Sequence, residues 1–206
     1  MIAAFDLDGT LLKNNGSWAF CDFLCERGFL SKRAMLYYAF IYARHRVLGL
    51  SLWDLHSLAF ERSFKGCTVD SLLPYIDEFL EQRLEELWYP PAVLRLKRMR
   101  DRGFECMILS NSPRFFVEHV ARKLGVEKVF ATEYQVDTEG KFAGLTLLMD
   151  GDQKKTEILG LGGQKTVAFS DSHLDLPFLE AAHIAVAVNP QRLLKKVAHK
   201  RGWEIL

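Results

Sequence analysis

The sequence has 206 residues, which suits one core domain with a substantial insertion, or two small domains. Its composition, 49% hydrophobic and 26% charged, is that of an ordinary globular protein, and a net charge of +1 gives no indication of nucleic-acid binding. The four cysteines lack paired CxxC spacing and nearby histidines, so we expect reduced thiols in a cytoplasmic protein rather than a disulfide framework or a metal site.

Four short apolar runs predict strands that are buried on both faces, as in a parallel sheet covered by helices. They are residues 2–5, 106–109, 166–169 and 184–188. After the second run, Ser112 and Pro113 fit the start of a helix, and Gly125 fits its end. This unit of strand, polar loop and helix recurs, so we expect an α/β fold with a Rossmann-like parallel sheet.

The interval from residue 13 to residue 88 has no convincing strand and predicts about four helices. Helices inserted directly after the first strand would cover the carboxyl end of that strand. We therefore expect a core domain of residues 1–12 and 89–206 and a four-helix-bundle-like cap domain of residues 13–88. Residues 129–137 and 141–149 alternate around a turn and predict a β-hairpin that flanks the site.

Residues 34–52 are rich in aromatic and aliphatic side chains but are interrupted by Arg44, His45 and Arg46. A membrane-spanning helix needs roughly 20 mostly uncharged residues. We therefore expect no transmembrane segment here, and predict a buried helix or one that lines an apolar pocket.

Asp6 and Asp8 follow the first predicted strand, and residues two apart in an extended segment point the same way. Open α/β sheets bind ligands at the carboxyl ends of their strands. A carboxylate there can attack phosphorus if a cation such as Mg²⁺ screens it, and a second carboxylate can then transfer the proton. A strand followed by an ordinary Asp-Gly turn is the alternative interpretation.

Two further groups suit the binding of an anion. Ser110 and Asn111 follow the second strand, where a hydroxyl and backbone amides favour a phosphate, although helix capping explains them as well. Lys154 and Lys155 open a predicted helix, where a positive charge is unfavourable unless a bound phosphate compensates it. Only one of the two can point inward, and a solvated surface pair is the alternative.

Asp171 and Asp175 follow the third strand and offer more oxygen ligands for Mg²⁺, although Asp175 also fits a helix cap. His173 between them is a poorer candidate, because magnesium prefers oxygen. Each signal is weak alone. Their common position after strands that end at one edge of a sheet predicts a single site.

Together these segments resemble the four ordered motifs of the haloacid dehalogenase-like superfamily. FDLDGTL (residues 5–11) is similar to the first motif and ILSNSP (108–113) to the second, while KTEIL (155–159) and FSDSHLDLPFL (169–179) are similar to the third and fourth. The helical insertion after the first motif resembles the cap of subfamily IB, the phosphoserine-phosphatase-like branch. The resemblance covers nearly the whole chain and implies a phosphatase.

The resemblance implies that Asp6 is the nucleophile, which would form an aspartyl-phosphate intermediate, and that Asp8 is the general acid and base. It also implies that Ser110, Asn111 and Lys155 hold the phosphoryl group. Lys155 is preferred to the preceding lysine because a lysine leads the KTEIL pattern in related phosphatases.

The same resemblance implies Mg²⁺ as the cofactor. Asp6, the backbone carbonyl of Asp8, and Asp171 would be its ligands. Asp175 would support the water shell of the metal or the site lysine.

Two departures from the branch limit the substrate. Phosphoserine phosphatases carry an acid after the first motif that recognises the substrate amine, whereas residues 13–16 here read Lys-Asn-Asn-Gly. Ser170 stands where glycine is usual. We therefore expect a phosphatase that does not act on phosphoserine.

The leading hypothesis is hydrolysis of a small phosphorylated metabolite. Abundant aromatic residues between Trp18 and Tyr42 also allow a groove for a lipid phosphate head group, although a helical core needs such residues anyway. A phosphotransferase or mutase and a non-catalytic phosphate-binding module remain alternatives. The sequence does not indicate the oligomeric state.

Overall fold

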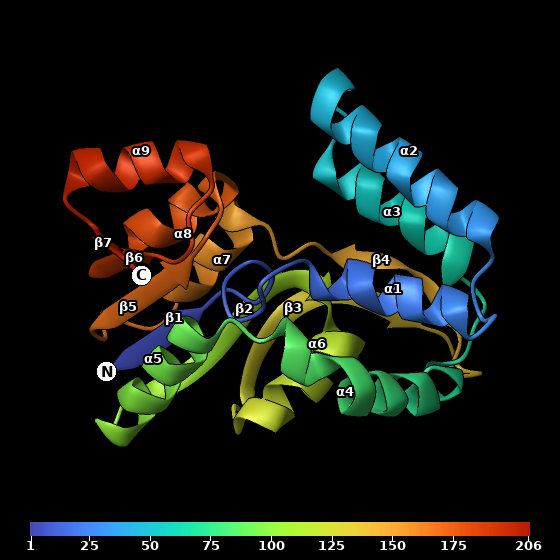
Figure 1. The fold of residues 1–206 in the computed structure, drawn as a ribbon, viewed down its shortest axis with the longest axis horizontal. Helices are drawn as coiled ribbons and strands as arrows, with labels where there is room; N and C mark the ends of the chain where they lie inside the picture. The colour runs from blue at the N-terminus through green and yellow to red at the C-terminus, as the bar shows by residue number, and fades with distance from the viewer.

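The computed structural model describes all 206 residues and has an α/β fold (Figure 1). Its strands are β1 (Ile2–Phe5), β2 (Glu105–Pro113), β3 (Lys128–Val136), β4 (Phe142–Leu147), β5 (Thr166–Ser170), β6 (Ile184–Ala187) and β7 (Glu204–Ile205). Its helices are α1 (Gly16–Glu26), α2 (Lys32–Leu48), α3 (Leu52–Ser63), α4 (Leu73–Leu87), α5 (Pro90–Asp101), α6 (Arg114–Leu124), α7 (Gly151–Leu159), α8 (Leu176–Ala181) and α9 (Arg192–Arg201). Two 3₁₀ helices are η1 (Val69–Ser71) and η2 (His173–Asp175).

The strands form one sheet in the order β4-β3-β2-β1-β5-β6-β7. All neighbouring pairs are parallel except β3 and β4, which are antiparallel. The predicted α/β fold with a parallel sheet is therefore confirmed. The first strand of the chain lies at the centre of the sheet, so the residue that follows it has a parallel strand on either side.

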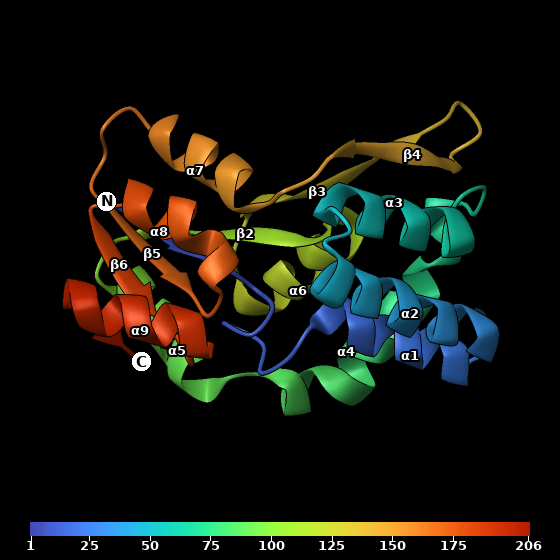
Figure 2. The same ribbon diagram turned by 90° about the horizontal axis from the view of Figure 1, so that it is seen from above.

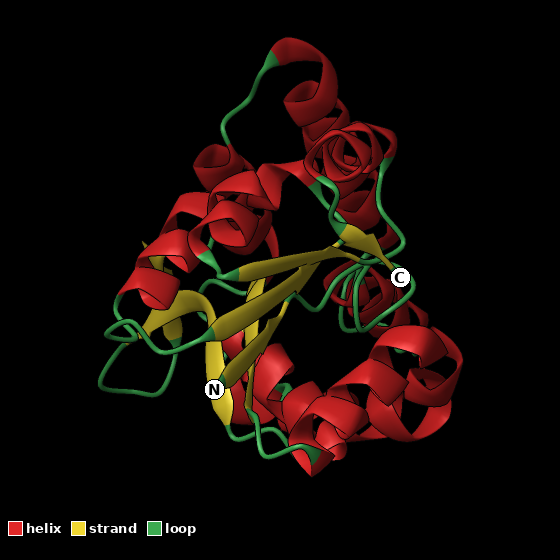
Figure 3. Cartoon of the chain, turned by 90° about the vertical axis from the view of Figure 1, so that its left-hand side faces the viewer, coloured by secondary structure: helices red, strands yellow, loops and turns green.

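Helices cover both faces of the sheet (Figure 3). On β1, Ala3 and Phe5 belong to a hydrophobic cluster that includes residues of α5 and α6, whereas Ile2 and Ala4 belong to a second cluster with residues of α7, α8 and α9. Because successive side chains of a strand point to opposite faces, this uninterrupted apolar run supplies both clusters. Burial on both faces fixes the position of the strand end that carries Asp6.

The helices α1 to α4 form an insertion between β1 and α5, beyond the carboxyl ends of the central strands (Figures 1 and 2). The chain leaves and returns at one place, where Leu12 and Trp88 form an antiparallel bridge. The amide of Lys13 donates to the Leu87 carbonyl at 2.8 Å, and the amide of Tyr89 donates to the Leu11 carbonyl at 2.8 Å. The two connecting segments are thus bound to each other.

Aromatic contacts hold this insertion on the rest of the molecule. Phe20 of α1 stacks on Phe116 of α6 with ring centroids 5.4 Å apart, and Phe60 of α3 stacks on Tyr134 of β3 at 4.6 Å. These rings belong to or pack against the same hydrophobic cluster that covers one face of the sheet. These aromatic contacts attach the insertion to α6 and to the β3–β4 hairpin.

Residues 34–48 belong to helix α2, but of the two expected alternatives the buried helix is wrong, and the cavity that α2 helps to line is mainly polar. In α2 only Ala34, Tyr38 and Ile41 are buried, and they lie three or four residues apart along one narrow stripe. Met35 and Tyr37 beside this stripe are half-buried. The remaining large apolar side chains of α2 are exposed, because only one face of the helix packs on its neighbours. None of the helices combines the length and the apolar composition that a membrane-spanning helix requires.

Strand β2 is longer than predicted, and this changes the start of the helix that follows. The strand includes Ser112, and α6 begins at Arg114 with Pro113 as its N-cap residue. The helix ends at Gly125 in the left-handed conformation, as predicted. The predicted hairpin is confirmed as β3 and β4, whereas the two-residue strand β7 was not predicted because it is too short to carry a pattern.

Candidate active site

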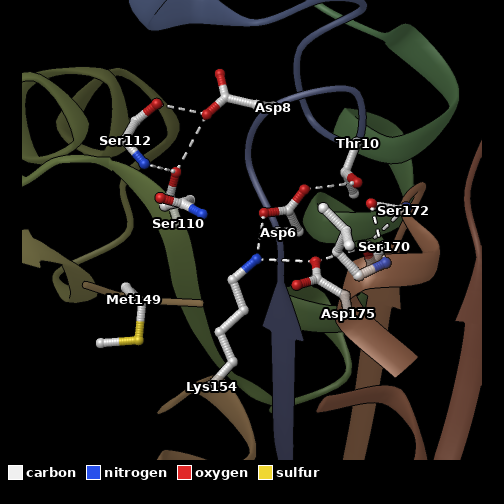
Figure 4. A network of polar contacts seen from close by, with 12 residues as sticks. Asp6, Asp8, Thr10, Ser110, Ser112, Met149, Lys154, Ser170, Ser172 and Asp175 are labelled. Carbon is white, nitrogen blue, oxygen red and sulfur yellow. Dashed lines mark hydrogen bonds and ion pairs between the residues drawn. The ribbon is translucent and has the colours of Figure 1, made fainter. Parts of the chain in front are cut away.

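Polar side chains from four segments meet at the carboxyl ends of the central strands (Figure 4). Asp6 follows β1, Ser110 lies near the end of β2, and Asp171 follows β5. Lys154 comes from α7, and Asp175 ends η2. All five are buried. Sequence reasoning predicted that most of these residues would meet, because parallel strands end at one edge of the sheet.

The centre of this group is a buried lysine. The Nζ atom of Lys154 lies 2.7 Å from Asp6 Oδ1 and 2.8 Å from Asp175 Oδ2, and the residue is only 2% exposed. Burial alone would lower the pKa of Lys154, but the attraction of Asp175 and Asp6 outweighs it and raises that pKa above the ordinary value. Lys154 therefore stays charged, and its third N–H remains available to a ligand.

The choice of Lys155 as the site lysine is wrong, because its side chain is exposed. Helix α7 begins at Gly151 with Asp150 as its cap, and its buried positions are Gly151, Lys154 and Ile158. A Cβ atom on Gly151 would lie 2.1 Å from the Leu174 carbonyl oxygen, so this position must face the η2 loop. Positions three and seven residues later share that face, and the next lysine is turned away.

Ser170 and Lys154 hold the Asp175 carboxylate in the site. The Ser170 hydroxyl donates to Asp175 Oδ2 at 2.7 Å, the same oxygen that accepts from Lys154. The alternative interpretation of Asp175 as a helix cap does not apply, because α8 has no side-chain cap. The serine that replaces the usual glycine thus adds a hydrogen bond that fixes a partner of the lysine.

Thr10 connects the end of β1 to the end of β5. Its hydroxyl lies 3.1 Å from Asp6 Oδ2 and 3.3 Å from Asp171 Oδ1, and it accepts from the Asp171 amide at 3.0 Å. Gly9 has a φ of 80°, and a Cβ atom there would lie 2.5 Å from Asp171 Oδ2. Only glycine both adopts this conformation without strain and leaves room for the carboxylate.

The site holds more negative charge than Lys154 neutralises. Burial, together with repulsion from neighbouring carboxylates, raises the pKa of Asp6 well above its ordinary value, although Lys154 opposes the change. Burial likewise raises the pKa of Asp171 to about 6, against a hydrogen bond from Gln191. With Asp8 and Asp175 there are four carboxylates around a single ammonium group, which favours the binding of a further cation.

The donor set fits Mg²⁺. No three His, Cys, Asp or Glu side chains gather closely enough to enclose a metal by themselves. Asp6 and Asp171 instead share the Thr10 hydroxyl, so two buried carboxylates approach one point. Magnesium is usually bound by one or two carboxylates and completes its shell with water, which matches such a pair better than a closed cage of side chains.

The Asp8 carboxylate takes different partners and is turned toward Ser110 and Ser112 of β2 (Figure 4). Its Oδ1 accepts from the Gly16 amide at 2.6 Å, and its Oδ2 accepts from the hydroxyls of Ser112 at 2.5 Å and Ser110 at 3.3 Å. Burial raises the pKa of Asp8, although these hydrogen bonds oppose the change. Asp8 is thus a better proton carrier near neutral pH than an exposed aspartate.

Sequence reasoning missed the role of Ser112, which it interpreted as a helix cap. The Ser112 hydroxyl donates to Asp8, and it accepts in turn from the Ser17 hydroxyl of α1 at 2.5 Å. A chain of hydrogen bonds therefore runs from the inserted helices to Asp8. The structure does not bring the Asn111 side chain into this network, since its Oδ1 atom is buried without a partner and only its carbonyl accepts a hydrogen bond, from Thr132.

Comparison with known proteins agrees with this geometry. Residues 3–180 match the family of haloacid dehalogenase-like hydrolases. A protein of unknown function from Bordetella pertussis has a similar structure, with a TM-score of 0.88 at 22% identity over 100% of this chain and 97% of that one. The chain belongs to the haloacid dehalogenase-like hydrolase family.

The relatives include phosphatases. The chain is 30% identical to a "probable phosphatase" of Mycobacterium tuberculosis, over 99% of this chain and 74% of that protein. It is 26% identical to a phosphoserine phosphatase of the same organism, over 98% of this chain and 69% of that protein. The chain is thus a phosphatase of this hydrolase family, as the order of its motifs predicted.

The two adjacent lysines give a direct test of the buried ion pairs. Lys154→Met leaves two buried carboxylates without their cation, so we expect a loss of about 3 kcal/mol in unfolding free energy. For a chain of this size that corresponds to a fall of roughly 6–12 °C in Tm at neutral pH. Lys155→Met is the matched control and should leave Tm unchanged in differential scanning calorimetry. Equal effects of the two substitutions would contradict the assignment of Lys154.

Proposed function

We propose that this protein is a magnesium-dependent phosphatase that hydrolyses phosphomonoesters through an aspartyl-phosphate intermediate on Asp6. The observation that carries the proposal is the buried carboxylate of Asp6, held between Lys154 and Thr10. These contacts orient the carboxylate for attack on phosphorus. In this proposal, the hydroxyl of Ser110 and the free N–H of Lys154 would bind the phosphoryl oxygens.

In the first step, an oxygen of Asp6 attacks phosphorus and the bond from phosphorus to the leaving oxygen breaks. Asp8 donates its proton to that oxygen, so that an alcohol departs rather than an alkoxide. The raised pKa of Asp8 supports this role, because a larger fraction of the carboxyl groups carries a proton before the reaction. The product of this step is a phosphoryl group bound to Asp6.

In the second step, water attacks the phosphorus of the intermediate and Asp8 takes a proton from that water. The bond between phosphorus and the Asp6 oxygen breaks, inorganic phosphate leaves, and both carboxyl groups return to their starting states. The hydrogen bonds from Ser112 and Gly16 keep Asp8 at one place between the two proton transfers.

Asp6, the carbonyl of Asp8, and Asp171 are the residues that would hold Mg²⁺. When bound, the metal neutralises charge and allows a carboxylate to approach a phosphate dianion. Lys154 would hold the phosphoryl group, in place of Lys155, and Asp175 would position Lys154. The four carboxylates around one lysine support the need for an additional cation.

We further propose that residues 13–88 form a cap that selects a small phosphorylated metabolite. The two segments that connect the insertion to the sheet domain pair with each other at Leu12 and Trp88, which supports this boundary. A groove for a lipid phosphate has less support, because Phe20, Phe23 and Tyr38 are part of the hydrophobic core, and the cavity beside the exposed Tyr42 is lined mainly by polar residues.

Replacing the nucleophile tests the first step. Asp6→Asn should lower kcat for p-nitrophenyl phosphate with Mg²⁺ by at least about a thousandfold, because an amide cannot form the intermediate. Asp22→Asn changes an exposed aspartate on α1 and should leave kcat unchanged. Circular dichroism spectra that match the wild type would show that both variants fold. Substantial activity of Asp6→Asn would rule out this residue as the nucleophile.

Replacing Asp8 separates the two proton transfers. p-Nitrophenolate is a good leaving group that departs without a proton, whereas the attack of water needs a base. Asp8→Asn should therefore release p-nitrophenolate in a rapid burst of about one equivalent, followed by slow turnover, in stopped-flow absorbance. An acid-quenched sample should carry one phosphoryl group by mass spectrometry. Steady turnover at the wild-type rate would show that Asp8 is not the base.

The excess of negative charge in the site predicts that Mg²⁺ reverses the order of stability of the wild type and Asp171→Asn. Without Mg²⁺, Asp171→Asn removes one of four clustered negative charges, so its Tm should equal or exceed that of the wild type. With Mg²⁺ at about one hundred times its Kd, the wild type should gain about 2.7 kcal/mol and become the more stable protein. Differential scanning fluorimetry with EDTA and with Mg²⁺ measures both. Equal shifts of the two proteins would contradict the proposed ligand.

A further inference from the structure

A cavity of about 460 Å³ lies between the helical insertion and the sheet domain. Its lining residues are Tyr42, Arg46, His173, Gln191, Arg192 and Leu193. The first two belong to α2 and the others to η2 and the beginning of α9. In Figure 1 the end of α2 and the first turn of α9 face each other across this region. The cavity therefore needs both parts of the molecule to form.

The lining of the cavity suits an anion. Arg46 and Arg192 form no ion pair, and no acidic residue lines the cavity. The Nδ1 atom of His173 is buried without a hydrogen-bond partner. Two guanidinium groups that face one space without a carboxylate attract an anionic ligand, and carboxylates and phosphates match their paired donors.

The start of α9 adds to this electrostatic preference. Gln191 is the N-cap residue of α9, but its side chain does not accept a hydrogen bond from the first turn. Its amide instead donates to Asp171 Oδ2 at 3.0 Å. The first N–H groups of the helix thus have no side-chain acceptor and lie beside Arg192 at the cavity wall, where the helix dipole is positive.

The cavity adjoins the site at the strand ends. Gln191 lines the cavity and also contacts Asp171, through both its side chain and its backbone amide, which donates to the Asp171 carbonyl at 2.9 Å. His173 follows Asp171 by two residues. A ligand whose phosphoryl group lay at Asp6 would therefore extend past Gln191 toward the two arginines.

We infer that this cavity binds a second anionic group, a phosphate or a carboxylate, on the alcohol portion of the substrate. The inference rests on the proposed phosphatase function and adds a substrate class to it: small phosphomonoesters that carry another negative charge. Arg46 recognises this group from the insertion and Arg192 recognises it from the sheet domain. The second anionic group of the substrate thereby connects the insertion to the sheet domain.

Matched substrates test the inference. For each of several chain lengths, kcat/KM is measured for the bisphosphate of an α,ω-alkanediol and for the monophosphate of the same diol, at one concentration of free Mg²⁺. The corresponding ω-phosphooxyalkanoates distinguish a carboxylate from a phosphate as the second group. We expect substrates that carry the second anionic group to be preferred over the monophosphate by about tenfold or more at one chain length. Equal kcat/KM for all pairs would overturn the inference.

Substitutions that remove single positive charges show which residues produce the preference for a second anionic group. Arg46→Gln and Arg192→Gln should each lower the ratio of the two kcat/KM values by about tenfold, mainly through KM. Arg33→Gln on α2 and Lys195→Gln on α9 remove exposed charges from the same helices, outside the cavity, and should leave the ratio unchanged. A preference that survives both cavity substitutions would show that the second group binds elsewhere.

Calorimetry separates this inference from the proposed chemistry. The bisphosphate should bind to Asp6→Asn about tenfold more tightly than the monophosphate, and Arg46→Gln in that background should remove the difference. If the wild type hydrolyses no phosphomonoester, the proposed function fails, and the same titration still tests the cavity. If hydrolysis is observed but the two ligands bind equally, the cavity inference alone is overturned.

Discussion

The buried ammonium group of Lys154 holds three separate segments of the chain together. It contacts Asp6 at the end of β1 and Asp175 at the end of η2, while its own backbone lies in α7. An unpaired charge at this depth would be strongly unfavourable, so each partner depends on the others. The same contact creates an imbalance, because Asp8 and Asp171 add two more carboxylates nearby. A phosphate would add further negative charge, which is why a divalent cation and a phosphorylated ligand suit this site together.

The positions of the site residues were predictable to the extent that they depend on strand ends. Asp6, Ser110 and Asp171 follow or end short apolar runs, and parallel strands that share an edge bring such residues together whatever the loops do. The site lysine was not predictable in the same way. The phase of α7 depends on where the helix starts, and the contact of Gly151 with the Leu174 carbonyl fixes that phase. This contact joins segments that are distant in the sequence.

Two other predictions from the sequence were wrong for the same reason, because they too depended on tertiary contacts. Ser112 and Pro113 have the chemistry of a helix start, but pairing with β3 extends β2 through both residues. The hydroxyl of Ser112 is then available to Asp8 instead of to a helix. The apolar content of α2 predicted burial, yet only the stripe that includes Tyr38 has neighbours to pack against. Composition shows how much apolar surface a helix has, whereas burial depends on which face meets a partner.

The helical insertion takes part in the proposed proton transfer as well as in the proposed recognition of substrate. Its first two helical residues, Gly16 and Ser17, bind Asp8 directly and through Ser112. A Cβ atom on Gly16 would lie 2.5 Å from Leu12 Cδ1 and 3.3 Å from Asp8 Oδ1, so the helix approaches as closely as its backbone allows. The hydrogen-bonded partners of Lys154, Asp6 and Asp175, both belong to the sheet domain. A shift of α1 would therefore disturb the hydrogen bonds to Asp8 while those that hold Asp6 stayed in place. The position of the insertion against the sheet domain thus supplies both the hydrogen bonds to Asp8 and the wall of the cavity that carries Arg46.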